Sequence, residues 1–266
     1  MRRERPRCNP ESRLTRSRDP GADVQACVRR APAGRRMQCG GASLGPLTMS
    51  MALTSDATPE DVLRLVRDRG LLTLTSAGRS PSLVEEVAGE PVKGSWWGHP
   101  ASERIFKLAS ALEASPEILV VKLVGAKVTF LHRTLWPALA RIARDPERVA
   151  EVRERLSPAA VRLLAEVERV GEVRLDELAR QPAWPPERDL ARAAKELEAT
   201  LLAHTGSVHT DRGRHAIVLR SWARALPDSA RRDAAHLTLE AARAALESHG
   251  AAPALSVYRP PRARAR

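Results

Sequence analysis

Three cations lie at helical spacing in the segment ERDLARAAKELEAT, residues 187–200. Arg188, Arg192 and Lys195 stand at i, i+4 and i+7, so a helix over this segment places them on one face. The opposite face carries the apolar residues Leu190, Ala194 and Leu197. An exposed stripe of cations suits contact with phosphate groups. Glu187, Asp189 and Glu196 dilute the positive charge of this stripe.

A second group of cations follows at the tip of a predicted hairpin. The runs LLAHTGSVHT and HAIVLRSW indicate two strands, and the polar sequence DRGR separates them. Arg212, Arg214 and His215 fall at this tip, with His209 on the other strand. We expect the basic helix and the basic tip to contact DNA phosphates or bases together.

A third group surrounds two adjacent tryptophans in GSWWGHP, residues 94–100. One hypothesis is that an indole stacks on an exposed base, with cationic side chains nearby. The other, which we favour, is packing: neighbours in an extended segment point opposite ways, so one tryptophan is buried and the other half-covers a gap. Trp184, in PAWPP, has the equivalent place later in the chain, which supports packing. The candidate residues of this ligand or packing loop and the helix after it are Lys93, Trp96, Trp97, His99, Arg104 and Lys107.

The elements that position these groups begin at Thr58, an N-cap followed by Pro59. The pattern then predicts a helix ending at Gly70, a short strand over LLTLT and a short capped helix over SPSLVEEVAG. After the tryptophan loop comes a helix over ASERIFKLASALEAS, and its inner face carries Ile105, Leu108, Ala109 and Leu112. ILVVKLV-GA-KVTFLHR predicts a hairpin with a type II′ turn that starts at Gly125, and LWPALARIARD a connecting helix.

The same order repeats about a hundred residues later. SPAAVRLLAEVERVG predicts a capped helix, EVRL a strand and DELARQ a short helix, before the basic helix and the second hairpin. Local details also match, since ALEAS corresponds to ELEAT and FLHRTLW to IVLRSW. A repeat of this kind identifies the folding unit.

Helix, strand, helix, helix, hairpin is the order of a winged helix-turn-helix. We therefore predict a mainly α fold with short β-hairpins (α+β), made of two tandem winged-helix units: a first unit over residues 58–145 and a second unit over residues 157–225. One C-terminal helix over residues 227–250, rich in Ala and Leu, is expected to pack on the body or to form a homodimer. A basic tail over residues 251–266 completes the chain.

The second unit resembles winged-helix DNA-binding domains from Ser157 to Trp222. In such domains the third helix enters the major groove and the hairpin contacts the backbone or the minor groove. Residues 58–225 are similar to a family of small uncharacterised bacterial proteins, on the segments GSWWGHP and KVTFLHRTLWPAL, and no activity follows from that resemblance. Tandem winged helices also resemble bacterial glycosylases that act on alkylated and crosslinked bases. The Gln-x-Gln or His-x-Gln motif of those enzymes is missing here, because only Gln25, Gln38 and Gln181 occur.

No motif predicts catalysis, a metal site or a cofactor. There is no Walker loop, no GxGxxG after a strand, no GxSxG and no HExxH in the chain. His204, His209 and His215 lie along one hairpin, where alternation can pair two of them, but no paired cysteines accompany them. We expect no catalytic residues, no metal and no cofactor.

The net charge of +12 is unevenly distributed. Residues 1–48 carry 11 Arg against 4 acids and the last eight residues carry four more Arg, so the remainder is nearly neutral. We expect residues 1–50 to be a disordered Arg-rich extension that is not translated if synthesis begins at Met49 or Met51. All three cysteines lie in that extension, so the rest of the chain has no disulfide framework, which fits a reducing cytoplasm. No apolar run is long enough to span a membrane.

These patterns favour a non-catalytic cytoplasmic protein that binds DNA, duplex, distorted or single-stranded, in transcription regulation or DNA repair. The alternative is a protein-interaction scaffold that uses the winged helices and the Trp96/Trp97 loop. A glycosylase-like repair enzyme is the third hypothesis.

Overall fold

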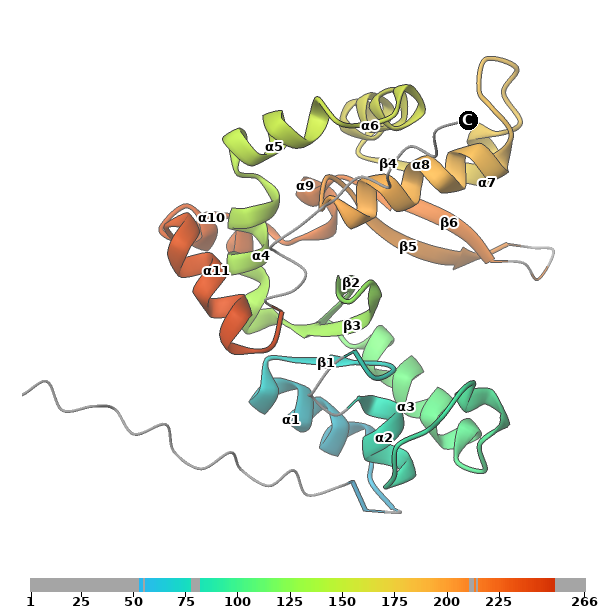
Figure 1. Cartoon of the computed structure of the whole chain (residues 1–266), viewed down its shortest axis with the longest axis vertical. Helices are drawn as coiled ribbons and strands as arrows, with labels where there is room; N and C mark the ends of the chain where they lie inside the picture. The colour runs from blue at the N-terminus through green and yellow to red at the C-terminus, as the bar shows by residue number, and fades with distance from the viewer. Residues whose placement is uncertain (1–52, 55, 78–81, 211–212, 214, 252–266) are drawn as a thin grey trace, which may run out of the picture. The chain divides into compact units, whose positions relative to one another are not determined.

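The computed structural model describes residues 53–251, apart from residues 55, 78–81, 211–212 and 214 (Figure 1). The predicted extension over residues 1–50 and the tail beyond residue 251 lie outside the described residues. The first unit contains, in order, α1 (Pro59–Arg69), β1 (Leu71–Thr73), α2 (Leu83–Ala88), the 3-10 helix η1 (Trp96–Gly98), α3 (Ser102–Ala114), β2 (Ile118–Val124) and β3 (Lys127–His132).

The second unit has the same order of helices and strands. It contains α6 (Pro158–Val170), β4 (Glu172–Arg174), α7 (Leu175–Leu178), α8 (Glu187–Ala199), β5 (His204–His209) and β6 (His215–Arg220). Each unit forms a three-stranded antiparallel sheet in which the hairpin's second strand is central, in the orders β1-β3-β2 and β4-β6-β5. The repeat in the sequence is therefore matched by a repeat in topology.

Local sequence signals fix several of the helix ends. Thr58 and Ser82 each cap a helix through a reciprocal capping box with the acid three residues later. Ser157 caps α6 by accepting a hydrogen bond from the backbone N–H of Ala160. Gly70 and Gly171 end α1 and α6, as the sequence predicts. The boundaries of these helices therefore follow from residues close to them in the sequence.

Three clusters of buried side chains hold the described chain together. One lies within the first unit and includes Phe130 and the inner face of α3, and a second lies within the second unit between α6, α7 and α8. The third joins both units, because it contains Leu119 and Leu131 from the first sheet together with Leu201 and Trp222. The inner faces predicted for α3 and α8 are confirmed, since all their named apolar residues are buried.

The remaining elements connect and cover the units: η2 (Arg133–Leu135), α4 (Trp136–Ala143), α5 (Pro146–Arg153), α9 (Trp222–Ala225), α10 (Asp228–Ala234) and α11 (Leu239–Ser248). The prediction of one helix over residues 227–250 is wrong, because residues 235–238 break it into α10 and α11. Thr238 caps α11 afresh by accepting from the backbone N–H of Ala241 at 3.1 Å. Both helices lie against α4 (Figure 1), where Ala242 and Leu246 are buried in the shared cluster.

The first hairpin turns at Gly125 and Ala126, as predicted, but the turn type differs. A type II′ turn has positive φ at its first central residue only, whereas Gly125 and Ala126 have φ of 55° and 57°. Positive φ at both positions is the signature of a type I′ turn. The sequence pointed to type II′ because alanine rarely adopts this conformation.

No helix among the described residues is long and apolar enough to cross a membrane.

Candidate nucleic-acid interface

The three cations predicted on α8 share one solvent-exposed face. Arg188, Arg192 and Lys195 are all exposed, while Leu190 and Leu197 on the other side are fully buried against α6 and α7. Amphipathic packing therefore orients the helix and turns the basic stripe outward. The helical spacing that predicted this stripe is confirmed, and its contact with nucleic acid stays a prediction.

Three of the acids on α8 have structural partners, among them Glu198, which pairs with Lys122 at 2.8 Å. Glu196 accepts hydrogen bonds from the backbone N–H of Ser157 at 2.8 Å and from its hydroxyl at 2.7 Å, which ties α8 to the start of α6. Asp189 forms an ion pair with Arg192, an exposed contact within one helical turn. Among the described residues, no carboxylate lies within ion-pair distance of Arg188 or Lys195, so these cations are available to a phosphate.

A groove of about 850 Å³ runs along α8 beside Arg192 and Lys195. Its other wall is formed by Leu156 and by Pro158 at the start of α6, so its lining is largely apolar. The groove places the two cations at the edge of a concave surface, where an extended ligand gains contact area.

The tip of the second hairpin is only partly described. Arg212 and Arg214 lie outside the described residues, so their predicted contacts are not located. His209 and His215 face each other across the strands, with ring centroids 4.0 Å apart, and both are exposed. The alternation of the two strands therefore pairs these imidazoles, as the sequence allowed. No group of three or more metal-ligating side chains gathers anywhere in the described part of the chain.

Two of the cations predicted in the first unit have partners within the protein. Arg104 is half-buried and donates to the backbone oxygen of Thr54, and Lys107 pairs with Glu103 at 2.7 Å. Lys93 is exposed in the loop before η1. This unit therefore lacks a cationic stripe like that of α8.

The tryptophan loop combines one buried and one exposed indole. Trp96 is 9% exposed and belongs to the core of the first unit, whereas Trp97 is 63% exposed. The expected extended segment is wrong, because residues 96–98 form a 3-10 turn and the two rings stack, with centroids 4.1 Å apart. His99 accepts from the backbone N–H of Ala101 through Nδ1 at 3.1 Å, which closes the loop onto α3.

Phe106 is a candidate residue that the sequence interpretation missed. It is 52% exposed on α3, and its ring centroid lies 5.9 Å from that of Trp97. The signal was present: an aromatic residue beside Ile105 falls outside the apolar helical face, where a polar residue is expected.

In the second unit Trp184 is half-buried against the core, and the Arg162 guanidinium lies 4.2 Å from its ring centroid. That cation–π contact covers the indole, so Trp184 packs as expected.

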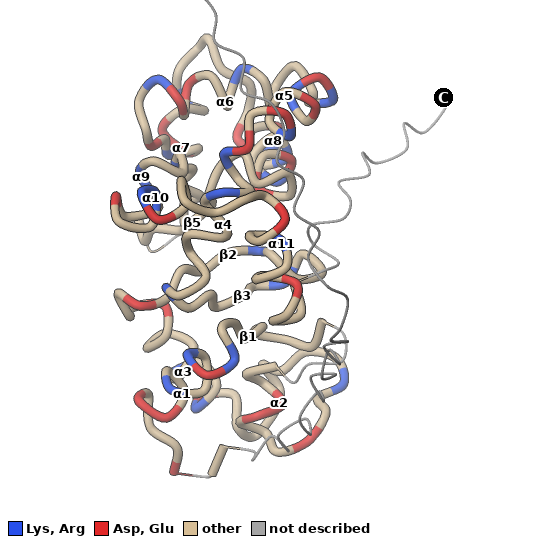
Figure 2. Tube along the Cα trace, turned by 90° about the vertical axis from the view of Figure 1, so that its left-hand side faces the viewer, with Lys and Arg blue, Asp and Glu red and all other residues tan. Residues whose placement is uncertain are grey.

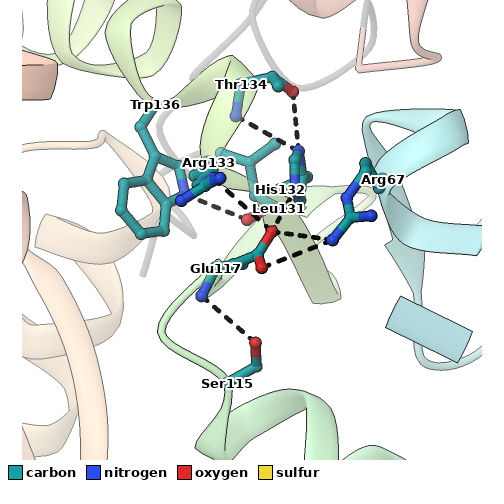
Figure 3. A network of polar contacts seen from close by, with 8 residues as sticks. All are labelled: Arg67, Ser115, Glu117, Leu131, His132, Arg133, Thr134 and Trp136. Carbon is teal, nitrogen blue, oxygen red and sulfur yellow. Dashed lines mark hydrogen bonds and ion pairs between the residues drawn. The ribbon is translucent and has the colours of Figure 1, made fainter. Parts of the chain in front are cut away.

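A network of polar contacts centres on Glu117 (Figure 3), and sequence reasoning did not find it. Its carboxylate accepts from Arg67 and from Nε2 of His132, each at 3.2 Å, and also pairs with Arg133. These contacts, first that of His132 and then that of Arg67, lower the pKa of Glu117.

The buried ring of His132 has a capping role in this network. Its Nδ1 lies 3.4 Å from the backbone nitrogen of Thr134, which donates to it, and 3.0 Å from the hydroxyl of the same residue. His132 is the N-cap of η2, so the network fixes the exit of β3 toward α4.

Charges of both signs are interleaved along the described chain (Figure 2). A basic surface on this part of the protein therefore depends on local placement, as on α8.

No protein-family model, curated protein or solved structure matches the chain.

Proposed function

We propose that residues 58–225 are two tandem winged helices and that the protein binds DNA without catalysis, in transcription regulation or DNA repair. Support for the fold comes from the shared order of helix, strand, helix, helix and hairpin, and from the shared strand order of the two sheets. In winged helices the helix before the hairpin is the recognition helix, which corresponds to α8 in the second unit.

One observation carries the functional proposal: the exposed stripe of Arg188, Arg192 and Lys195 on α8, opposite its buried face. Two of these cations, Arg192 and Lys195, line a groove, and phosphate contact needs such spaced cations on a rigid element. The exposed Arg192–Asp189 pair is weak in water and can exchange for a phosphate at small cost. The exposed hairpin residue His215 is a further contact candidate.

The experiment is fluorescence anisotropy of labelled duplex DNA with the full chain over a salt series. The double variant Arg192→Ala/Lys195→Ala is compared with Arg64→Ala/Arg169→Ala. The control removes two exposed arginines from other helices, each paired with an acid three residues away as Arg192 is. All proteins keep the same arginine-rich ends, so the contribution of those ends cancels in the comparison.

The stripe variant should bind more weakly, and its slope of log affinity against log salt should be smaller by about 2. The control should keep the slope of the unchanged chain. Equal losses in both variants would contradict the proposal, because net charge rather than α8 would then account for binding. No loss in either variant would also contradict it, because binding would then not depend on these α8 cations.

A further inference from the structure

The first unit carries an exposed aromatic surface in place of a basic one. Trp97 and Phe106 are the large apolar residues most exposed in the described part of the chain, and their rings lie 5.9 Å apart. Phe106 lies on α3, which has the place in the first unit that α8 has in the second. We call these two side chains the aromatic surface.

The aromatic surface is fixed before any ligand arrives. Trp97 stacks on Trp96, with ring planes 23° apart, and Trp96 is anchored in the core under α3. Phe106 is held by the backbone of a helix whose inner face is fully packed. Binding of a ligand here therefore orders few protein side chains and loses little conformational entropy.

The size of the aromatic surface decides what kind of ligand it suits. A stable protein interface buries about 800 Å² on each partner and has an apolar centre. Here the exposed neighbours are polar or small, including Lys93, Ser95 and Glu103, and the other large exposed apolar residues lie on α6. Two rings match one or two nucleobases, which stack on single aromatic side chains without a wider apolar surface.

The charges around the rings are compatible with a nucleic-acid strand. Lys107, next to Phe106, pairs with Glu103, and both side chains are more than two thirds exposed, at 71% and 79%. Such an exposed pair contributes little, so Lys107 can turn to a phosphate. Lys93 precedes the tryptophans in the same loop and is also exposed.

We propose that Trp97 and Phe106 form a stacking site for an unpaired base of DNA. This inference rests on the proposed function and narrows its substrate to DNA with unpaired bases, since bases stacked inside a duplex do not offer their faces. The two units then make different contacts with DNA: α8 contacts phosphates, and the aromatic surface binds an exposed base.

The test measures the affinity of the full chain for three labelled probes: a duplex, the same duplex with an oligothymidine overhang, and oligothymidine alone. The variants are Trp97→Ala and Phe106→Ala, with Trp97→Phe as the conservative change. Val161→Ala, which shortens an exposed apolar side chain on α6, is the matched control. Circular dichroism confirms the fold of each variant, and Phe106→Ala tests the surface without altering the tryptophan pair.

Loss of stacking should weaken binding to the overhang and to oligothymidine about ten-fold or more, with little change for the plain duplex. Trp97→Phe should keep most of the affinity, and Val161→Ala all of it. Unchanged affinity for the single-stranded probes in both alanine variants would overturn the inference while leaving duplex binding by α8 intact.

The two proposals fail in different ways. If the α8 variant shows no defect but Trp97→Ala still weakens oligothymidine binding, the duplex proposal fails and the stacking site stands. If instead Trp97→Ala changes only the sedimentation of the protein and no DNA affinity, the aromatic surface is a protein contact and the inference is wrong.

Discussion

The imidazole of His204 joins the two three-stranded sheets. Its Nε2 lies 2.9 Å from the backbone oxygen of Val120, and because a carbonyl only accepts, Nε2 carries the proton and donates. His204 begins β5 and Val120 lies in β2, the edge strands of their sheets. Nδ1 is buried and has no hydrogen-bond partner among the described residues. A neutral ring therefore fits this position, and a charged one does not.

Protonation of His204 should destabilise the fold. Burial is the main cause that lowers the pKa of His204 below its ordinary value of 6.5, and the Val120 carbonyl opposes it. The unfolded chain then binds more protons than the folded chain, so stability is complete above about pH 6.5 and falls as pH drops below it. The measurement is urea unfolding at several pH values between 7 and 5.

The comparison for this prediction is His204→Gln, whose side-chain amide can still donate to Val120. Between pH 7 and pH 5 the unchanged chain should lose more stability than the variant, with a slope difference of up to about 1.4 kcal/mol per pH unit. Parallel curves for the two proteins would show that other groups cause the pH dependence.

Arg148 connects the ends of two helices from different parts of the chain. Its guanidinium donates to the backbone oxygens of Ile142 and Ala143, at the end of α4, at 2.8 and 2.9 Å. It also donates to those of Thr200 and Leu201, after α8, at 2.6 and 3.2 Å. Two of these oxygens, those of Ile142 and Leu201, also accept from other N–H groups. The planar fork of arginine still joins both helix ends at once.

Replacing Arg148 with lysine should cost about 3 kcal/mol of unfolding free energy, because one ammonium group cannot reach carbonyls at both helix ends. The exposed neighbour Arg144 is the matched control, and Arg144→Lys should change stability by less than about 0.5 kcal/mol. Urea unfolding at neutral pH measures both. A loss below about 1 kcal/mol for Arg148→Lys would mean that the four bonds contribute little.

The sequence predicted those features that depend on neighbours along the chain. The caps Thr58, Ser82 and Ser157 and the buried faces of α3 and α8 follow from spacing alone, and the structure contains them. Helix α5 was missed because only Val152 of its residues is buried, so it has almost no apolar periodicity. The sequence nonetheless contains a signal for its start, since Asp145 caps it and Pro146 follows.

The candidate sites were harder to predict where they depend on contacts between distant segments. The exposed stripe on α8 follows from helical spacing, but the pairing of Glu196 with Ser157, which lie 39 residues apart, does not. The proximity of Trp97 to Phe106 requires the 3-10 turn that brings the loop back onto α3. The sequence gives no periodic signal for such a short turn, and the extended alternative was the natural expectation.

The turn of the first hairpin should become more stable when Ala126 is replaced by glycine. Ala126 has φ of 57°, a left-handed conformation that costs an L-residue with a Cβ about 1 kcal/mol. Ala126→Gly should therefore raise the unfolding free energy by about 0.5 kcal/mol, after the entropy of the freer unfolded chain is deducted.

The comparison for Ala126→Gly is the opposite change at the preceding residue, Gly125→Ala. Gly125 also has a positive φ, and a Cβ there would meet only Ala77 at 3.7 Å, an ordinary contact. Gly125→Ala should thus destabilise by about 0.5 kcal/mol, after the lower entropy of the unfolded chain offsets part of the conformational cost. Thermal unfolding of the two variants tests both predictions. A higher stability of Gly125→Ala than of the unchanged chain would refute the type I′ assignment.

The adjacent tryptophans should differ sharply in their contribution to stability. Trp96 is buried in the core of the first unit, so Trp96→Ala removes a large packed side chain and should cost about 3–5 kcal/mol. Trp97 contacts that core only through its stacked ring and is 63% exposed, so Trp97→Ala should cost about 1 kcal/mol or less. Urea unfolding of both variants measures the two losses of unfolding free energy. Similar costs would mean that Trp97 is a packing residue, and Phe106→Ala would then be the variant that decides whether the surface binds a base.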